Sequence, residues 1–351
     1  MIGKSDVQRL DGLTLLAAGL TILMWSSSFA AIAYGLQAFS PPELSLLRFL
    51  IASAVFAVPV AFGWIKLPPL RDWPAVLALG LIGITVYQLT LGFAMTRISV
   101  GATAVVIALS PGVTSALAAL RLGEEISRSA RIGLVVAFAG VVLITVGAGS
   151  QVRFEPMTLL LLISVLGTSI YFVWQKPLLA RTSATGFTVA SIFAGTLGLL
   201  PFGVHLPEKI AEVPHEQLWS ALYLGLFPTI LGYLSWNFAL SRAPASKVSS
   251  FMYVQPLVAG FIAWLWLGQV PTWLTAAGGL LAIACVVLTV SSSRKAAVKQ
   301  QRSLATTPAN GLPPRRGSQP RSEQRLHRAR PPALGTIARA RGVDSGALSN
   351  L

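Results

Sequence analysis

The chain has 351 residues, of which 54% are apolar and only 11% are charged, and its formal net charge is +15. A soluble domain carries about 25% charged residues, because its surface must be covered by side chains that water solvates. This composition argues against a soluble globular enzyme and predicts an all-α integral membrane protein.

A helix needs roughly 20 apolar residues to cross the hydrocarbon core of a bilayer. Runs of this kind, bounded by charges or by Pro and Gly clusters, recur along the chain. We predict ten transmembrane helices, over residues 12–34, 43–63, 74–95, 100–120, 131–147, 156–174, 186–204, 218–240, 248–267 and 272–290. The first run follows Asp6 and Asp11 and lacks a clear cleavage site, so we interpret it as a helix and not as a cleaved signal peptide.

Basic residues are distributed unequally between the two sides of the predicted bundle. The side that holds the N-terminus receives eleven Lys and Arg residues, the other side receives three, and twelve more follow Ser293 in the tail. Because cytoplasmic loops are enriched in Lys and Arg, we predict a multi-pass membrane protein with cytoplasmic N- and C-termini. The positive charge lies in loops and a tail instead of a folded basic domain, so we expect no nucleic-acid partner.

The two halves of the chain resemble each other at a constant offset of 145 residues. Between residues 92 and 145, fifteen of 54 positions are identical to their partners. The informative matches are Arg97 with Arg242, Pro111 with Pro256, Gly123 with Gly268 and Gly133 with Gly278. Five spans in each half place the second half upside down relative to the first, which is how many secondary transporters are built. The repeat therefore predicts two inverted five-helix units.

Several short motifs resemble the EamA-like transporters of the drug/metabolite transporter superfamily. These motifs are Trp25-Ser-Ser-Ser-Phe29, Leu47-Arg48-Phe49-Leu50, Ser110-Pro111 with Leu122-Gly123-Glu124-Glu125, and Gln255-Pro256 with Leu267-Gly268. Ser26 and Gln269 depart from the family pattern, at a Gly and at a second-half Glu. The resemblance implies EamA-like units at residues 12–147 and 156–290. It also implies a non-enzymatic carrier that exports or exchanges small metabolites or drugs by alternating access.

Arg48 is the only basic residue well inside a predicted span. A charge in hydrocarbon is costly, so this side chain should face a cavity or a partner. Two interpretations stay open: an anion-contacting or gating residue in the cavity, and a structural arginine that bonds helix-end carbonyls or snorkels outward. Glu124 and Glu125 lie in a cytoplasmic turn near Arg121 and Arg128, where they form either a gate latch or a loop salt-bridge cluster.

The remaining candidate cavity residues are prolines, aromatic residues and amides. Pro111 and Pro256 interrupt equivalent spans, and paired interruptions point to a transport site. Aromatic and amide side chains deep in the spans give apolar walls with a few polar handles. These side chains are Trp25, Tyr87, Gln88, Tyr171, Tyr233 and Gln255. We place Trp174, Trp236 and Asn237 near span ends, in the interfacial belt where aromatic residues gather.

No catalytic, cofactor or metal motif occurs in the sequence. The single cysteine, Cys285, lies in an apolar run, so we expect no disulfide. The tail at residues 294–351 is rich in Arg, Pro and Ser, which predicts a disordered basic cytoplasmic segment that can contact anionic lipid. A flippase for lipid-linked substrates and a non-transporting receptor or assembly protein remain alternatives. Substrate identity, coupling and oligomeric state are not indicated.

Overall fold

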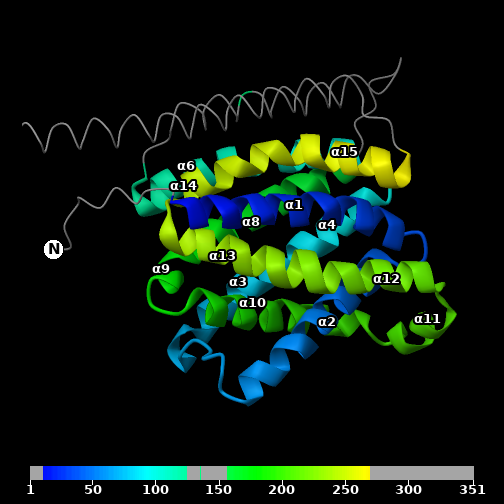
Figure 1. The fold of residues 1–351 in the computed structure, drawn as a ribbon, viewed down its shortest axis with the longest axis horizontal. Coiled ribbons are helices and arrows are strands. Elements are labelled where there is room, and N and C mark those ends of the chain that lie inside the picture. The colour runs from blue at the N-terminus through cyan, green and yellow to red at the C-terminus, as the bar shows by residue number, and fades with distance from the viewer. Residues whose placement is uncertain (1–10, 125–134, 136–155, 269–351) are drawn as a thin grey trace, which may run out of the picture. The chain divides into compact units, whose positions relative to one another are not determined.

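The computed structural model describes residues 11–124, 135 and 156–268, and all regular structure within them is helical (Figure 1). Eight helical segments of this part are long and apolar enough to cross a membrane. They are Gly12–Gly35, Pro41–Ala61, Leu70–Met95, Val100–Leu122, Met157–Leu179, Ala184–Phe202, His215–Arg242 and Ala245–Leu267. Each coincides with a predicted span to within a few residues. The predicted spans at 131–147 and 272–290, Glu125 and the tail lie outside the described residues.

Most of these spans consist of more than one helical element. In the first half the elements are α1 (Gly12–Gly35), α2 (Pro41–Ala61), η1 (Leu70–Asp72), α3 (Trp73–Gly80), η2 (Leu81–Val86), α4 (Tyr87–Met95), α5 (Val100–Ile107) and α6 (Ser110–Leu122). In the second half they are α8 (Met157–Trp174), α9 (Lys176–Leu179), α10 (Ala184–Leu199), η3 (Leu200–Phe202), α11 (Leu206–Glu212), α12 (His215–Leu224), η4 (Gly225–Gly232), α13 (Tyr233–Arg242), α14 (Ala245–Ser249), η5 (Ser250–Val254) and α15 (Gln255–Leu267).

The helix ends follow from local chemistry. The side chain of Asp11 accepts a hydrogen bond from the amide of Thr14 and caps α1. Ser40 and Glu43 form a capping box at the start of α2, so the carboxylate of Glu43 is used at the helix end. Gly123 and Gly268 end α6 and α15 with φ of 67° and 65°, a left-handed conformation that glycine adopts without steric cost. These two glycines occupy equivalent places in the two halves.

Two equivalent spans are interrupted at the paired prolines. The first breaks between Ile107, where α5 ends, and Ser110, where α6 begins. The second passes through the 3-10 segment η5 before α15 begins at Gln255. Pro111 and Pro256 lie in the first turn of α6 and α15, where a missing amide hydrogen is tolerated. The expected paired interruption is therefore present in the fold.

A second pair of irregularities was not anticipated from the sequence. Both η2 and η4 are π-helical, and an offset of 145 residues carries η2 onto positions inside η4. A π segment accommodates an extra residue in a turn and often marks a functional site. It also shifts the side chains that follow it to a new face of the helix. Tyr87 and Tyr233 are the first residues after the two π segments.

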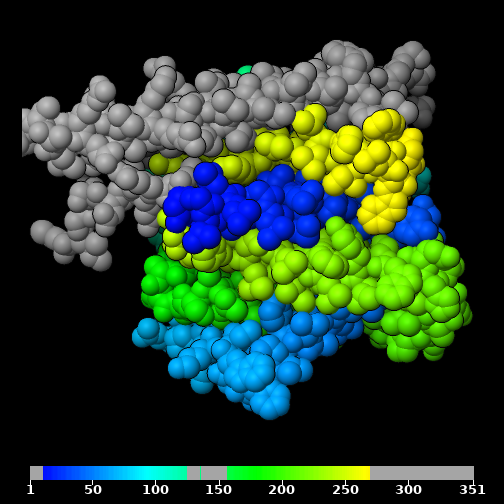
Figure 2. Space-filling view, in the orientation of Figure 1, coloured from blue at the N-terminus to red at the C-terminus, as the bar shows by residue number. Residues whose placement is uncertain are grey.

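Helices from the two halves of the chain pack against each other. Helix α1 contacts α12, η4, α13 and α15, while α2 contacts α10 and η4. Figure 1 shows α1 running beside α15 and α13, and the space-filling view in Figure 2 shows the same adjacency between α1 and α15. On the outer face of α1, the side chains of Leu13, Leu16 and Leu23 are exposed, as expected for a helix that contacts lipid. The central cavity lies between these interleaved helices.

Candidate functional site

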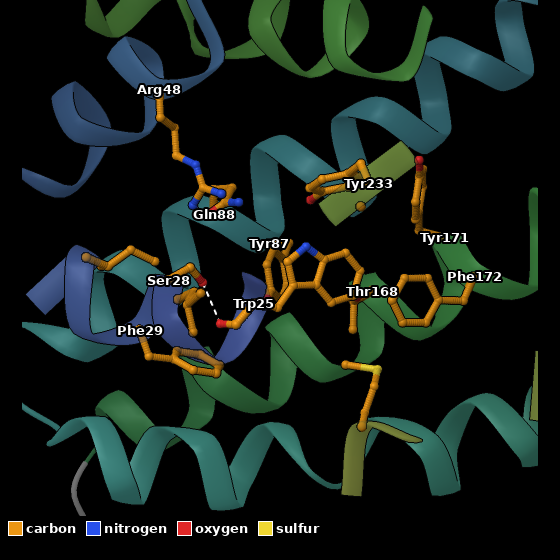
Figure 3. A pocket seen from close by; sticks show the side chains of 14 residues that line it. Trp25, Ser28, Phe29, Arg48, Tyr87, Gln88, Thr168, Tyr171, Phe172 and Tyr233 are labelled. Atoms are coloured by element: carbon orange, nitrogen blue, oxygen red, sulfur yellow. Dashed lines mark hydrogen bonds between the residues drawn. The ribbon is translucent and has the colours of Figure 1, made fainter. Parts of the chain in front are cut away.

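A narrow cavity lies at the centre of the described helices (Figure 3). Its walls come from α1, α2, the Leu70–Met95 span, α8, α13 and η5. Its volume is about 20 Å³, which is room for about one water molecule. Six of the nine predicted cavity residues line it: Trp25, Arg48, Tyr87, Gln88, Tyr171 and Tyr233. A solute larger than water enters this space only if the walls move apart.

Arg48 is the charged residue of the cavity and is only 3% exposed. Its Nε donates to Thr229 Oγ1 at 3.0 Å, and its Nη1 donates to Gln88 Oε1 at 3.3 Å. In Figure 3 the side chains of Arg48 and Gln88 converge at one end of the cavity. Within the described residues, no carboxylate forms an ion pair with Arg48. The guanidinium is thus buried, hydrogen-bonded and electrically unbalanced.

The partner of Arg48 on η4 is a residue that sequence analysis missed. Thr229 follows Pro228, which has no amide hydrogen to donate to the carbonyl of Leu224. The hydroxyl of Thr229 donates to that carbonyl at 2.8 Å and accepts from Arg48. The pair Pro-Thr inside a span was the available signal, but its link to Arg48 crosses 181 positions of sequence.

Aromatic side chains form the rest of the cavity wall. Trp25 donates from Nε1 to the carbonyl of Pro228 at 3.2 Å, which fixes its ring. Ring centroids of Phe172, Tyr233 and Trp236 lie 6.0, 5.4 and 5.1 Å from that of Trp25. Because the ring of Trp25 is hydrogen-bonded and has three aromatic neighbours, the wall is apolar and preorganised.

The predicted location in the interfacial belt was wrong for two residues. Trp236 and Asn237 are both 0% exposed and lie inside the bundle. Trp236 packs on Phe172 with centroids 4.5 Å apart, and Asn237 donates to Thr188 Oγ1 at 2.8 Å. Trp174, in contrast, is 37% exposed, as expected for a belt residue. The prediction failed because the position of a residue along a span does not show which way its side chain points. The helix continues to Arg242, and both side chains face the interior of the bundle.

Glycines let the backbone approach the aromatic wall. A Cβ added at Gly83, within η2, would lie 2.4 Å from Tyr171 Cβ. A Cβ at Gly232, at the end of η4, would lie 2.6 Å from Trp25 Nε1. No real Cβ is found this close to another heavy atom, so the two π segments approach these aromatic side chains so closely only because the two positions carry no side chain.

Three predicted cavity residues do not line the cavity. Pro111, Gln255 and Pro256 are buried at the helix interruptions but are absent from its walls. A smaller pocket shares Arg48 and Gln88 with the central cavity and extends to Leu36 and Pro41, around the α1–α2 connection. Arg48 therefore lies on the side of the cavity that is nearer to this end of the bundle.

The opposite end, where α1 begins, is tied together by polar contacts on residues 240–246, here called the 240–246 loop. The carboxylate of Glu124 accepts from the amides of Ala245 and Ser246, each at 3.0 Å. Lys176 Nζ donates to the carbonyls of Leu240 and Ala243, each at 2.7 Å.

The third contact on the same loop is an ion pair. Arg242 pairs with Asp11 at the start of α1. Hydrogen bonds from Thr14 and the neighbouring Arg242 lower the pKa of Asp11 from 3.8 to about 2. The stability that this carboxylate contributes is complete above its ordinary pKa and is lost only as pH falls toward 2, so Asp11 stays charged at physiological pH.

The chain is similar to known proteins over most of its length. The model of the EamA-like transporter family matches residues 12–146 and 156–291. A protein of Streptantibioticus cattleyicolor named probable terminal-alkyne amino-acid exporter is 33% identical over 269 residues, which cover 77% of this chain and 90% of the relative. The uncharacterized transporter YdfC of Bacillus subtilis is 30% identical over 275 residues, covering 78% and 90%.

More distant proteins also match most of the chain. A probable amino-acid metabolite efflux pump of Salmonella typhimurium is 26% identical over 302 residues, covering 82% of this chain and 97% of that protein. A crystal structure at 21% identity superposes with a TM-score of 0.62 over 80% of this chain and 98% of the other, which shows a shared fold. The two family matches together span most of the chain, and the chain belongs to the EamA-like transporter family.

Proposed function

We propose that the protein is a secondary transporter that moves small organic solutes across the membrane by alternating access. The observation that carries this proposal is the buried guanidinium of Arg48, which faces a cavity between the two halves without a carboxylate partner among the described residues. An unbalanced charge inside a membrane is costly and typically marks a substrate pathway. Two relatives named as amino-acid or amino-acid-metabolite exporters support solutes of that size.

We further propose ten spans in two inverted five-helix units, with both termini in the cytoplasm. The offset of 145 residues supports this, because it relates the left-handed glycines, the proline interruptions and the π segments of the two halves. Equivalent irregularities in inverted units supply two equivalent gates around one site. The cavity, with room for about one water molecule, fits a contracted state between loading and release.

The 240–246 loop is the proposed gate at the end where α1 begins. Glu124 ties the end of α6 to the start of α14, and the Asp11–Arg242 pair ties α1 to α13. The equivalent of Arg242 in the other half is Arg97, whose side chain is exposed and forms no hydrogen bond or ion pair with the described residues. These polar contacts therefore favour closure at the end where α1 begins over closure at the end where Arg97 lies.

Transport through this site is tested in proteoliposomes that contain the purified full chain. We expect saturable exchange of a solute from an amino-acid and amino-acid-metabolite panel, and a loss of roughly tenfold or more in Arg48→Gln at an unchanged melting temperature. Arg97→Gln is the matched control, because this arginine is exposed at the other end. Vesicles that exchange no member of the panel, or normal exchange by Arg48→Gln, would contradict the proposal.

The gate is tested by labelling from one side of the membrane. In a Cys285→Ala background, Ser28→Cys places a thiol in the cavity wall. Glu124→Gln should increase its labelling by an impermeant reagent from the side where α1 begins, because the amides of Ala245 and Ser246 lose a charged acceptor. Glu216→Gln, an exposed change on α12, should leave labelling unchanged. Equal labelling in all variants excludes this gate.

A further inference from the structure

We infer that the preferred substrates are monocarboxylates with a small apolar or aromatic body, bound as net anions in preference to zwitterionic amino acids and to cations. The inference rests on the proposed function and names the substrate class of the same site. It departs from the plainest reading of the relatives' names, which point to amino acids.

The first argument is the charge balance of the cavity. Arg48 contributes a positive charge, and none of the residues that line the cavity is acidic. Three of the described carboxylates near the ends of the spans are engaged elsewhere: Glu43 in its capping box, Asp72 with Arg181, and Glu124 on the 240–246 loop. Because a buried uncompensated charge is unfavourable, a ligand that delivers one negative charge is favoured over a neutral or positive one.

The second argument is that every hydrogen-bond acceptor in the cavity wall is neutral, so an ammonium group finds no negative charge there to balance its own. These acceptors are the amide oxygen of Gln88, which already accepts from Arg48, and the hydroxyl groups of residues such as Ser28 and Thr168. The ammonium of an α-amino acid is attached to the carbon that bears the carboxylate, so binding at Arg48 would also bring two positive charges together.

Cation–π attraction to the ring of Trp25 does not supply the counter-charge that an ammonium group lacks in this cavity. Trp25 has the most favourable ring for a cation, but Phe172 stacks on it at a centroid distance of 6.0 Å, and Tyr233 lies against it at 5.4 Å. These neighbours occupy part of the surface of the Trp25 ring that a cation would approach. They instead create an apolar surface against which an aliphatic or aromatic body can pack.

The geometry of Arg48 favours a carboxylate over a more highly charged anion. Arg48 Nε donates to Thr229, and Nη1 donates to Gln88. The described contacts leave the remaining N–H groups of the guanidinium for a ligand. One guanidinium balances one carboxylate through paired hydrogen bonds. A phosphate monoester would leave a second negative charge in the cavity.

Binding of a matched ligand series tests this inference. The full chain in detergent at neutral pH is titrated calorimetrically with 3-phenylpropionate, N-acetylphenylalanine, phenylalanine, phenethylamine and phenyl phosphate. We expect the two monocarboxylates to bind roughly tenfold or more tightly than phenylalanine, and phenethylamine and phenyl phosphate to bind more weakly still. The preference should fall to within about twofold in Arg48→Gln.

A charge-reversing variant makes the test independent of the folding of Arg48→Gln. Gln88→Glu places a carboxylate beside Arg48 with little change of shape, so it should remove the preference for monocarboxylates and strengthen phenylalanine relative to them. Gln37→Glu, an exposed change in the α1–α2 connection, is the control and should keep the wild-type order.

The possible results separate this inference from the proposed function. Wild-type protein that binds phenylalanine as tightly as 3-phenylpropionate, or that binds none of the series, overturns the inference. Transport itself is then decided by the proteoliposome panel, which includes zwitterions. An unchanged ligand order in Gln88→Glu also overturns it, because the charge at Arg48 would not set the selectivity.

Discussion

The guanidinium of Arg48 is positioned by a hydroxyl that belongs to an irregular segment of another span. Thr229 lies in η4 directly after Pro228, where regular α-helical bonding is interrupted. Its hydroxyl donates to the carbonyl of Leu224, and this fixes the oxygen that receives Arg48 Nε. A hydrogen bond that involves a charged group contributes about 1.5–3 kcal/mol to stability. Thr229 is therefore a positioning residue for the cavity charge.

Replacing Thr229 by Val keeps the side-chain shape and removes this acceptor. We expect Thr229→Val to lower the affinity for carboxylates about tenfold and to destabilise the protein by about 1–3 kcal/mol. The measurements are calorimetric titration and detergent melting. Thr96→Val is the control, because its hydroxyl donates to the carbonyl of Phe93 at an exposed helix end. Equal affinities in the two variants would show that Thr229 does not position the guanidinium.

At the scale of single elements, the π segments bring the backbone close to the cavity wall. Gly83 lies in η2 against Tyr171, and Gly232 ends η4 against Trp25. The residues that immediately follow these segments, Tyr87 and Tyr233, line the cavity. A regular α-helix would turn these tyrosines by a different amount, so the π geometry determines which side chains reach the cavity.

Gly83→Ala and Gly19→Ala form a matched pair on transmembrane helices. Alanine is favoured over glycine in a helix by about 1 kcal/mol, and a Cβ at Gly19 meets nothing within 4 Å. We expect Gly19→Ala to keep or raise the melting temperature. Gly83→Ala should lower the melting temperature by several degrees and reduce exchange, because its Cβ meets Tyr171. Two equally stable, equally active variants would rule out a tight contact at η2.

The paired prolines test whether the interruptions matter to conformational change. Pro111→Ala and Pro256→Ala restore an amide hydrogen at the start of α6 and α15, which favours a continuous helix there. We expect normal insertion, an unchanged or higher melting temperature and slower exchange in both variants. The exposed Pro69→Ala serves as control. Faster or unchanged exchange in both would assign the prolines to packing alone.

For the whole molecule, membrane topology is the central prediction. The proposed arrangement of two inverted five-helix units requires an even number of spans and both termini on one side of the membrane. We expect reporter fusions after Ser150 and Leu206 to be external and fusions after Leu70 and Ser293 to be cytoplasmic. Enzymatic reporters active only outside or only inside the cell measure this directly. An external reporter after Ser293 would remove a span and break the repeat.

Local chemistry allowed most of the fold to be predicted from the sequence. Length and hydrophobicity of a run decide whether it crosses a membrane, and Pro and Gly mark where a helix breaks or ends. For this reason the eight described spans and the interruptions at Pro111 and Pro256 were predicted. Gly123 and Gly268 were noted only as matching positions of the two halves, and the structure shows that they are C-caps. The π segments were not, because an extra residue in a turn depends on what the helix packs against.

The sequence by itself determined that Arg48 is a cation inside a span, but only the tertiary structure decided what surrounds it. Its hydrogen-bond partner on η4 lies 181 positions away in sequence. Likewise, Trp236 and Asn237 lie near a span end in sequence yet are completely buried. Hydropathy fixes which segments enter the membrane. The rotation of each helix about its axis, and therefore which side chains meet in the cavity, depends on packing between helices that are distant in the chain.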